Sequence, residues 1–143
     1  MQTLMTHSAQ ETIQWAKNFA PTLQPGDVIC LQGDLGAGKT TLVKGIAEGL
    51  GLSQKEQVTS PTFVIMHRYT CRIPLYHFDC YRMKSPDDLL QIGFDDFVNS
   101  GAGIACIEWP EKAGDLIPQK HISVTLTHEG LDARRITVCM KQR

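Results

Sequence analysis

The stretch that decides the fold of this chain is Gly33-Asp34-Leu35-Gly36-Ala37-Gly38-Lys39-Thr40-Thr41. Its first glycine and its Gly-Lys-Thr ending fit the G-x-x-x-x-G-K-[ST] pattern of loops that bind nucleotide phosphates. Glycines allow a positive φ and a close approach of the backbone to an anion, and the resulting turn aims several N–H groups at one phosphate. Lys39 would supply charge to the β and γ oxygens, and the Thr40 hydroxyl is placed to ligate Mg²⁺. Residues 33–41 are therefore predicted to form a nucleotide-binding segment.

The flanking residues provide the strand and the helix that such a loop needs. Val28 to Leu31 is a continuous apolar run, which is typical of a strand covered on both faces. A helix is predicted from about Lys39 to Leu50, because apolar residues recur there at helical spacing, and Gly51 is expected just beyond its end. The positive end of this helix would face the same phosphates. A glycine-rich turn that binds nothing is the simpler alternative, and this context argues against it.

The composition limits the classes of function. The 143 residues predict one domain, 1–143, with its own core. No apolar run is long enough to cross a bilayer and no secretory signal is visible, so we expect a cytoplasmic protein without a membrane role. A net charge of −1 argues against a tight, autonomous grip on nucleic acid. Among the five cysteines, Cys30 and Cys106 lie in apolar runs and are predicted to be buried thiols in a reducing compartment.

The other elements complete an α/β pattern. A capping box, Ser8-x-x-Glu11, predicts the start of a helix that ends or kinks near Ala20, before Pro21. Ser85 is predicted to be an N-cap with Pro86 at N1. The further predictions are an edge strand at 2–5, strands at 63–69 and 75–79, helices at 86–91 and 95–99, a strand at 103–107, and alternating strands around 122–126 and 136–140. Together they predict a three-layer sandwich like that of P-loop NTPases, with parallel central strands and antiparallel edge hairpins.

Two carboxylates close predicted buried strands. Asp79 follows Leu75 to Phe78, and Glu108 follows Ile104 to Ile107. Ligands of open α/β sheets collect at the carboxyl ends of strands. A phosphate loop needs an acidic partner for Mg²⁺, directly or through water, and some sites use another acid to orient the attacking water. The alternative for each residue is a solvated strand end.

Three further residues near these carboxylates have two interpretations each. His77 is either a packed structural histidine, which we favour, or a ligand. Trp109 belongs either to the core or to a lid over the site. Thr62 either senses a γ-phosphate, as switch loops do, or begins a strand. The chain has no late Asn/Thr-Lys-x-Asp stretch of the kind that reads guanine, which favours ATP over GTP.

Four blocks of the sequence together resemble one known family. They are the glycine-rich stretch, Ser60-Pro61-Thr62-Phe63, Tyr76-His77-Phe78-Asp79-Cys80-Tyr81-Arg82 and Ile107-Glu108-Trp109-Pro110-Glu111. In this order they are similar to the bacterial TsaE (YjeE) family, the small ATPases of tRNA threonylcarbamoyladenosine biosynthesis. The resemblance runs from about Ser8 to the C-terminal hairpin. Cys80 departs from it, because the family more often has Leu there.

The resemblance implies a Mg²⁺-dependent ATPase that uses ATP and Mg²⁺ as cofactors. Its partners would be the threonylcarbamoyl transferase subunit TsaD and the paralogue TsaB, and it would reach tRNA indirectly, through that complex, in modifying position 37. The roles that it implies are Mg²⁺ ligands for Thr40 and Glu108, a phosphate-binding role for Lys39, an essential acid at Asp79, a functional aromatic beside the nucleotide at Trp109, and positions near the base and ribose for Thr12 and Arg134.

Two other functions stay open at this point. A small-molecule kinase would share the loop and the fold, but such enzymes carry an arginine-rich lid, and the segment from Pro86 to Gly103 contains no Arg or Lys. A nucleotide-binding scaffold that does not hydrolyse its ligand is the other alternative. The presence of both Asp79 and Glu108 weakens it.

Overall fold

A computed structural model describes residues 1–34, 36–52, 58 and 65–141 of the chain. In this part of the chain, seven strands form a single mixed sheet in the order β1-β7-β6-β2-β5-β4-β3. The strands are β1 (Gln2–Thr6), β2 (Val28–Gln32), β3 (Met66–Tyr69), β4 (Leu75–Asp79), β5 (Ile104–Glu108), β6 (His121–His128) and β7 (Arg134–Lys141). The neighbouring strands β6, β2, β5 and β4 run parallel to one another. At one edge of the sheet β7 pairs antiparallel with β6 and β1 pairs antiparallel with β7, and at the other edge β3 pairs antiparallel with β4. This confirms the predicted parallel centre with antiparallel edge hairpins.

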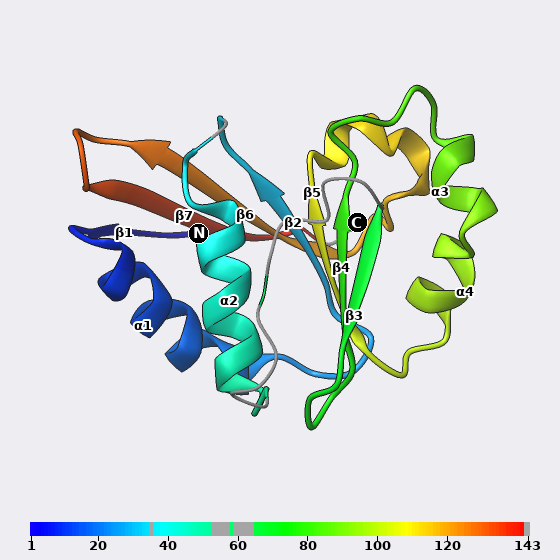
Figure 1. Cartoon of the computed structure of the whole chain (residues 1–143), viewed down its shortest axis with the longest axis horizontal. Coiled ribbons are helices and arrows are strands. Elements are labelled where there is room, and N and C mark those ends of the chain that lie inside the picture. Colours follow the sequence, from blue (N-terminus) through cyan, green and yellow to red (C-terminus); the bar gives the residue numbers. More distant parts are fainter. Residues whose placement is uncertain (35, 53–57, 59–64, 142–143) are drawn as a thin grey trace.

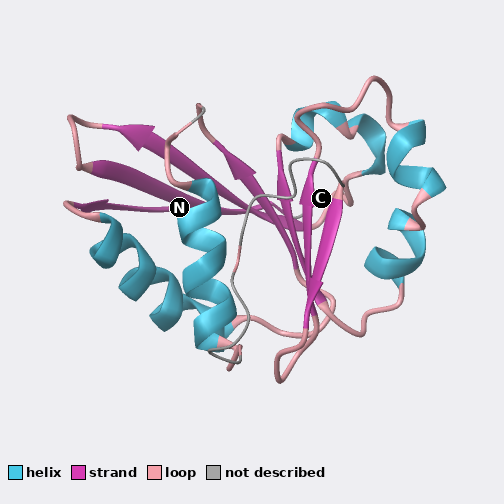
Figure 2. Cartoon of the chain, viewed as in Figure 1, coloured by secondary structure: helices cyan, strands magenta, loops and turns pink. Residues whose placement is uncertain are grey.

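Helices cover both faces of the sheet. The helices are α1 (Ala9–Phe19), α2 (Lys39–Gly49), α3 (Asp87–Gln91) and α4 (Phe94–Asn99), with short 3-10 turns at Ala20–Thr22, Pro110–Lys112 and Gly114–Leu116. The helices α1 and α2 lie together on one side of the strands, and α3 and α4 lie on the other (Figure 1). Figure 2 shows the strands as one layer between these two pairs of helices. Among the described residues, no helix combines the length and the apolar character needed to cross a bilayer.

Two hydrophobic cores follow from the alternation of side chains along the central strands. In β2, Ile29 and Leu31 pack with α1 and α2, whereas Val28 and Cys30 pack in the cluster that includes Leu89 of α3 and Phe94 of α4. The continuous apolar runs of β2 and β5 are thus explained by burial on both faces. Fully burying one such aliphatic side chain stabilises the fold by about 1.5–3 kcal/mol.

Most predicted element boundaries agree closely with the structure, and two details differ. The hairpin β6–β7 forms as expected and extends the sheet, but Met140, next to the end of β7, is exposed. Ser85 is not the N-cap that we expected, because α3 begins at Asp87 and its cap position is held by Pro86, which forms no side-chain cap bond. The backbone N–H of Lys84, which precedes the helix, donates to Asp88 Oδ2 at 3.0 Å, so an acid of the first turn is bonded to the segment before α3. Residues 63 and 64 of the strand predicted before Tyr69 lie outside the described residues.

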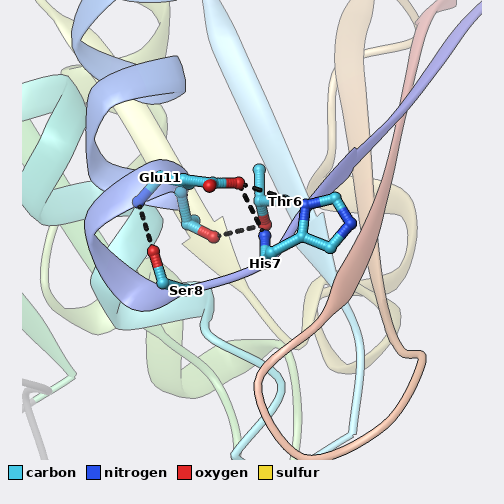
Figure 3. Close-up of polar contacts among 5 residues, drawn as sticks. Thr6, His7, Ser8 and Glu11 are labelled. Carbon is cyan, nitrogen blue, oxygen red and sulfur yellow. Dashed lines mark hydrogen bonds and ion pairs between the residues drawn. The ribbon is translucent and has the colours of Figure 1, made fainter.

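The start of α1 is fixed to the end of β1 by a variant of the predicted capping box. Ser8 Oγ accepts a hydrogen bond from the N–H of Glu11 at 3.1 Å, as a capping box requires. The Glu11 carboxylate, however, accepts from the N–H of His7 at 2.8 Å (Figure 3). That hydrogen bond is the main reason why the pKa of Glu11 lies below its ordinary value. This hydrogen bond ties the start of α1 to His7, which precedes the N-cap and directly follows the last residue of β1, Thr6.

The helices α1 and α2 are held close together by glycines on α2. A Cβ added at Gly45 would lie 2.6 Å from Ala16 Cβ and 2.6 Å from the carbonyl oxygen of Ile13. A Cβ at Gly49 would lie equally close to Ala20 Cβ. Only hydrogen fits at these two positions, so the helix that follows the glycine-rich loop packs directly on α1.

Candidate nucleotide-binding site at the carboxyl ends of the central strands

The glycine-rich loop connects the end of β2 to the start of α2 at the carboxyl edge of the parallel strands. Gly36 and Gly38 have φ of 79° and 104°, a backbone conformation that L side chains rarely adopt. A Cβ at Gly33 would lie 2.6 Å from the carbonyl oxygen of Leu126, whereas a Cβ at Gly36 would meet nothing within 4 Å. The first glycine therefore permits a close approach to β6, and the second faces open space. Both features agree with the predicted loop; Leu35 lies outside the described residues.

The first turn of α2 presents backbone N–H groups without a side-chain cap. Gly38 is the N-cap and forms no side-chain cap bond, and no acidic residue lies in the first turn. The amino end of a helix carries a partial positive charge and unbonded N–H groups, which suit an anion. Thr40 and Thr41 lie in this turn and are half-buried.

Lys39 is buried at the base of this loop, with 5% of its surface exposed. Its Nζ donates a hydrogen bond to the carbonyl oxygen of Gly33 at 2.5 Å and lies 3.6 Å from the centroid of the Trp109 ring. Burial lowers the pKa of Lys39, and the nearby carboxylates, first among them Glu108 and Asp79, oppose that effect. The ammonium is thus held by the Gly33 carbonyl and the face of the Trp109 ring.

Glu108 contacts the first turn of α2, and only 3% of its surface is exposed. Its Oε2 accepts a hydrogen bond from Thr40 Oγ1 at 3.3 Å and lies 2.5 Å from Nε2 of His77, which is fully buried. The two residues predicted to ligate Mg²⁺ are therefore brought together across 68 positions of sequence. His77 is packed inside the protein, as we favoured, but it also contacts the site carboxylate.

Asp79 lies beside Glu108 because their strands are neighbours. The register of β4 and β5 pairs Asp79 with Glu108, and the register of β2 and β5 pairs Leu31 with Glu108. Asp79 is half-buried, and its Oδ1 accepts a hydrogen bond from the N–H of Tyr81 at 3.0 Å. Both predicted carboxylates thus reach the same edge of the sheet, next to the loop.

Trp109 follows Glu108 directly and lies between the site and the surface. Its φ of 58° makes it the one residue other than glycine with a positive φ among those described. Its ring lies 4.9 Å from that of Tyr81, and Lys112 Nζ lies 5.7 Å from the Tyr81 ring centroid. Trp109 is half-buried and packs at the margin of the α3–α4 core. Trp109 therefore fits both interpretations that the sequence left open, because it packs partly against the core and its ring lies over Lys39.

Arg134 contacts the loop from β7, and Thr12 is linked to Arg134 through Thr6. Arg134 Nε donates to the carbonyl oxygen of Ala37 at 3.0 Å, and its Nη2 lies 3.5 Å from that of Gly36. Thr6 is the register partner of Arg134, and its hydroxyl lies 2.7 Å from that of buried Thr12 (Figure 3). Thr12 is thus linked to the end of β1 through Thr6, while Arg134 contacts the loop itself.

The structure brings most of the predicted site residues to one place. Lys39, Thr40, Asp79, Glu108 and Trp109 surround the loop. Asp34 is exposed on the loop, and its carbonyl oxygen accepts from the N–H of Ala37. Thr62, with the rest of Ser60-Pro61-Thr62-Phe63, lies outside the described residues.

Sequence reasoning missed two neighbours of the site, Tyr81 and Lys112, and one contact, that of His77 with Glu108. Tyr81 and Lys112 extend the aromatic contact from Trp109, and nothing in the local pattern marks them. The contact of His77 with the site had a signal that was not used. Because side chains alternate along a strand, His77 and Asp79 share one face of β4, so a carboxylate at the site implied a histidine beside it.

Comparison with known proteins agrees with this arrangement. The family model described as "Threonylcarbamoyl adenosine biosynthesis protein TsaE" matches residues 6–136. The chain is 40% identical over 134 residues to the tRNA threonylcarbamoyladenosine biosynthesis protein TsaE of Treponema pallidum, covering 94% of this chain and 97% of that protein. It is 42% identical over 133 residues to the protein of the same name from Bacillus subtilis, covering 92% and 81%.

A solved structure gives the same result for the fold. The crystal structure of YdiB from Bacillus subtilis superposes with a TM-score of 0.84 at 37% identity, covering 99% of this chain and 86% of that one. The match therefore includes the sheet, both helical layers and the edge that carries the glycine-rich loop. With a family model over most of its length and relatives at about 40% identity, this chain belongs to the TsaE family.

Proposed function

We propose that this protein is a cytoplasmic, Mg²⁺-dependent ATPase of the P-loop type that acts with the threonylcarbamoyl transferase complex of TsaD and TsaB. The reaction that it serves is the formation of N6-threonylcarbamoyladenosine at position 37 of tRNA. Membership of the TsaE family supports the role in tRNA threonylcarbamoyladenosine biosynthesis. The observation that carries the ATPase proposal is the meeting of Lys39, Thr40 and Glu108 at the mouth of the glycine-rich loop.

The loop and α2 suit the triphosphate of a nucleotide. Open space at Gly36 leaves room for phosphate oxygens, and the amino end of α2 adds its partial positive charge. Lys39 would exchange the Gly33 carbonyl and the Trp109 ring for β and γ oxygens. Phosphate oxygens are the stronger partners for an ammonium because both groups are charged.

Thr40 and Glu108 fit a magnesium ion. Mg²⁺ prefers hard oxygen ligands and commonly binds through one or two protein groups together with phosphates and water. Among the described residues, no cluster of three or more His, Cys, Asp or Glu side chains provides a dedicated metal site. The hydroxyl of Thr40 donates its proton to Glu108, so the lone pairs of its oxygen are available to a cation. When bound, the ion would neutralise charge that develops on the phosphate oxygens.

The other site residues have supporting roles in this proposal. Asp79, next to Glu108, would orient the attacking water or support the metal. Arg134 and Thr12 would define the side of the loop where the base and ribose lie. ATP is favoured over GTP because the chain lacks the guanine-reading stretch.

Turnover by the isolated chain is expected to be slow. In related NTPases an arginine that neutralises transition-state charge is worth orders of magnitude in rate. The arginine that the described residues bring to the loop, Arg134, is hydrogen-bonded to backbone carbonyls. A docked partner would complete and close the site.

The test is phosphate release from ATP by the isolated chain, then with TsaD and TsaB, and then with tRNA added. We expect slow release alone, acceleration by the complex, and no release by the Lys39→Ala variant under any condition. Full activity in isolation, indifferent to the complex, would contradict the partner-dependent role and favour an independent kinase or phosphatase. ATP binding without release in any mixture would instead indicate a scaffold that does not hydrolyse.

A further inference from the structure

His77 is a fully buried imidazole in the middle of β4, next to the proposed cation site. Its register partner on β5 is Cys106, yet its Nε2 reaches diagonally to Oε2 of Glu108, two residues further along, at 2.5 Å. The same carboxylate oxygen accepts the hydrogen bond from Thr40. One oxygen atom therefore joins a residue of β4, the carboxylate at the end of β5 and the first turn of α2.

The hydrogen of this imidazole is placed by its partner. A carboxylate only accepts hydrogen bonds, so Nε2 of His77 carries the hydrogen and donates it to Glu108. The other ring nitrogen, Nδ1, has no hydrogen-bond partner within the described part of the chain. A buried polar group with half of its bonding capacity unused costs free energy that an apolar side chain at this position would avoid. The contact with Glu108 is what distinguishes histidine from an apolar residue here.

We propose that His77 is a positioning residue that holds the Glu108 carboxylate in the orientation needed for Mg²⁺. Its N–H keeps Oε2 turned toward the imidazole and the Thr40 hydroxyl, which leaves Oε1 and the lone pairs of the hydroxyl oxygen for the cation and its water. Partners that orient metal ligands in this way typically contribute 10- to 100-fold to metal affinity. This inference rests on the proposed role of Glu108 in binding Mg²⁺.

The matched test uses two amides that differ in reach. In His77→Gln the side-chain NH₂ takes a place close to that of Nε2 and can still donate to Glu108. In His77→Asn the NH₂ is one methylene shorter and cannot reach the carboxylate. Neither replacement titrates, and both place an amide in the same core position.

The measurement is the Mg²⁺ concentration that gives half of the thermal stabilisation produced by a non-hydrolysable ATP analogue. We expect His77→Gln to stay within about threefold of the parent, and His77→Asn to need about 10- to 100-fold more Mg²⁺. Binding of the analogue in the presence of EDTA, measured by calorimetry, should be the same in all three proteins. A purely structural histidine would change the melting temperature without changing the Mg²⁺ requirement.

Two controls separate this inference from the proposed function. If the parent shows no Mg²⁺ dependence, or Glu108→Gln does not change it, the proposed cation site itself is wrong. If Glu108→Gln raises the Mg²⁺ requirement and His77→Asn does not, only the positioning role is wrong. His77→Leu, which keeps an apolar volume in the core, replaces the Asn variant should that variant not fold. Failure of both to fold while His77→Gln folds would also overturn the proposal, because the hydrogen bond would then serve the core.

Discussion

The ammonium of Lys39 lies 3.6 Å from the centroid of the Trp109 ring while it donates a hydrogen bond to Gly33. A cation over an indole face is stabilised by about 0.5–2 kcal/mol, which is less than charge-assisted bonds to several phosphate oxygens would provide. The same ammonium is the group that the proposed site needs for phosphate. Nucleotide binding and the contact with Trp109 therefore compete for one side chain.

Trp109 fluorescence should consequently report nucleotide binding. In a Trp15→Phe variant, which leaves Trp109 as the only tryptophan of the chain, addition of Mg²⁺ and an ATP analogue should change the emission intensity saturably as Lys39 leaves the ring. Trp15 stacks on Phe19 in α1, at a ring distance of 5.0 Å, and is a suitable silent position. The further variant Lys39→Ala should lose the response, and an unaltered response in it would show that Lys39 is not the cause.

Lys39→Ala and Asp79→Asn should separate binding from turnover. Lys39→Ala removes the ammonium at the loop, so we expect a large loss of ATP affinity together with loss of hydrolysis. Asp79→Asn keeps a polar group beside Glu108, so affinity should stay within about threefold while turnover falls by about tenfold or more, as expected for an interaction made in the transition state. Calorimetry and phosphate release on the same preparations make the comparison. Equal losses of affinity in the two variants would mean that the role of Asp79 is misassigned.

Arg134 should affect nucleotide binding more than its neighbour Arg135 does. Arg134 fixes the carbonyl groups of Ala37 and Gly36, whereas Arg135 is exposed and pairs with Glu129 at 3.3 Å. Loss of one hydrogen bond from a charged group costs about 1.5–3 kcal/mol, so Arg134→Ala should weaken ATP binding by about tenfold or more. Arg135→Ala should bind as the parent does. Similar titrations for both variants would leave Arg134 with no part in shaping the loop.

Gly45→Ala should destabilise the fold although alanine favours helices. The added methyl group would overlap Ala16 and the Ile13 carbonyl, and such overpacking costs about 1–3 kcal/mol. Glu48→Ala, on the exposed side of the same helix, should change the free energy of unfolding by less than about 0.5 kcal/mol. Chemical denaturation of the three proteins provides the comparison. A Gly45→Ala protein as stable as the parent would show that α1 can move away from α2 at little cost.

The cysteines should differ in reactivity according to burial. Burial, with a smaller effect of Asp79, raises the pKa of the Cys80 thiol to about 12, and burial also raises that of Cys106. Because the thiolate is the reactive form, both thiols stay protonated and unreactive at pH 8. A short pulse of iodoacetamide, followed by mass spectrometry, should label the partly exposed Cys139 and leave Cys80 and Cys106 unmodified unless denaturant is present. Rapid labelling of Cys80 in the native protein would contradict its buried position.

The parts of the fold that sequence could predict are those with a strong local signal. The run Val28 to Leu31 and the helical spacing after Lys39 determined β2 and α2, because periodicity reports burial directly. The prediction of an N-cap at Ser85 was wrong because the local signal for a helix end is weaker than that for a helix interior. Several neighbouring residues can serve as the cap of a helix, and here Pro86 holds the cap position while Asp88 accepts from the N–H of Lys84, which precedes the helix. Helix ends are therefore less well determined than helix interiors.

The site could be predicted in content but not in contacts. Asp79 and Glu108 were recognisable as the ends of buried strands, and the family resemblance implied that Thr40 and Glu108 share a Mg²⁺ ion. The order of the strands, which sets Asp79 next to Glu108 and brings His77 within reach, depends on tertiary pairing. The contact of Lys39 with Trp109 depends on the backbone conformation at Trp109, which no local pattern indicates.

That backbone conformation also determines what a substitution at position 109 measures. A φ of 58° is tolerated by glycine and asparagine, is uncommon for bulky residues, and is a marked outlier for β-branched ones. An alanine there removes the indole and keeps the strain, while a glycine removes both. The difference in unfolding free energy between the two variants, after correction for the greater backbone entropy of glycine in the unfolded chain, measures the conformational energy stored between the carboxylate and the aromatic ring. Trp109 is thus a strained residue as well as a cover over Lys39, and relaxation of its backbone would change the direction in which the chain leaves β5.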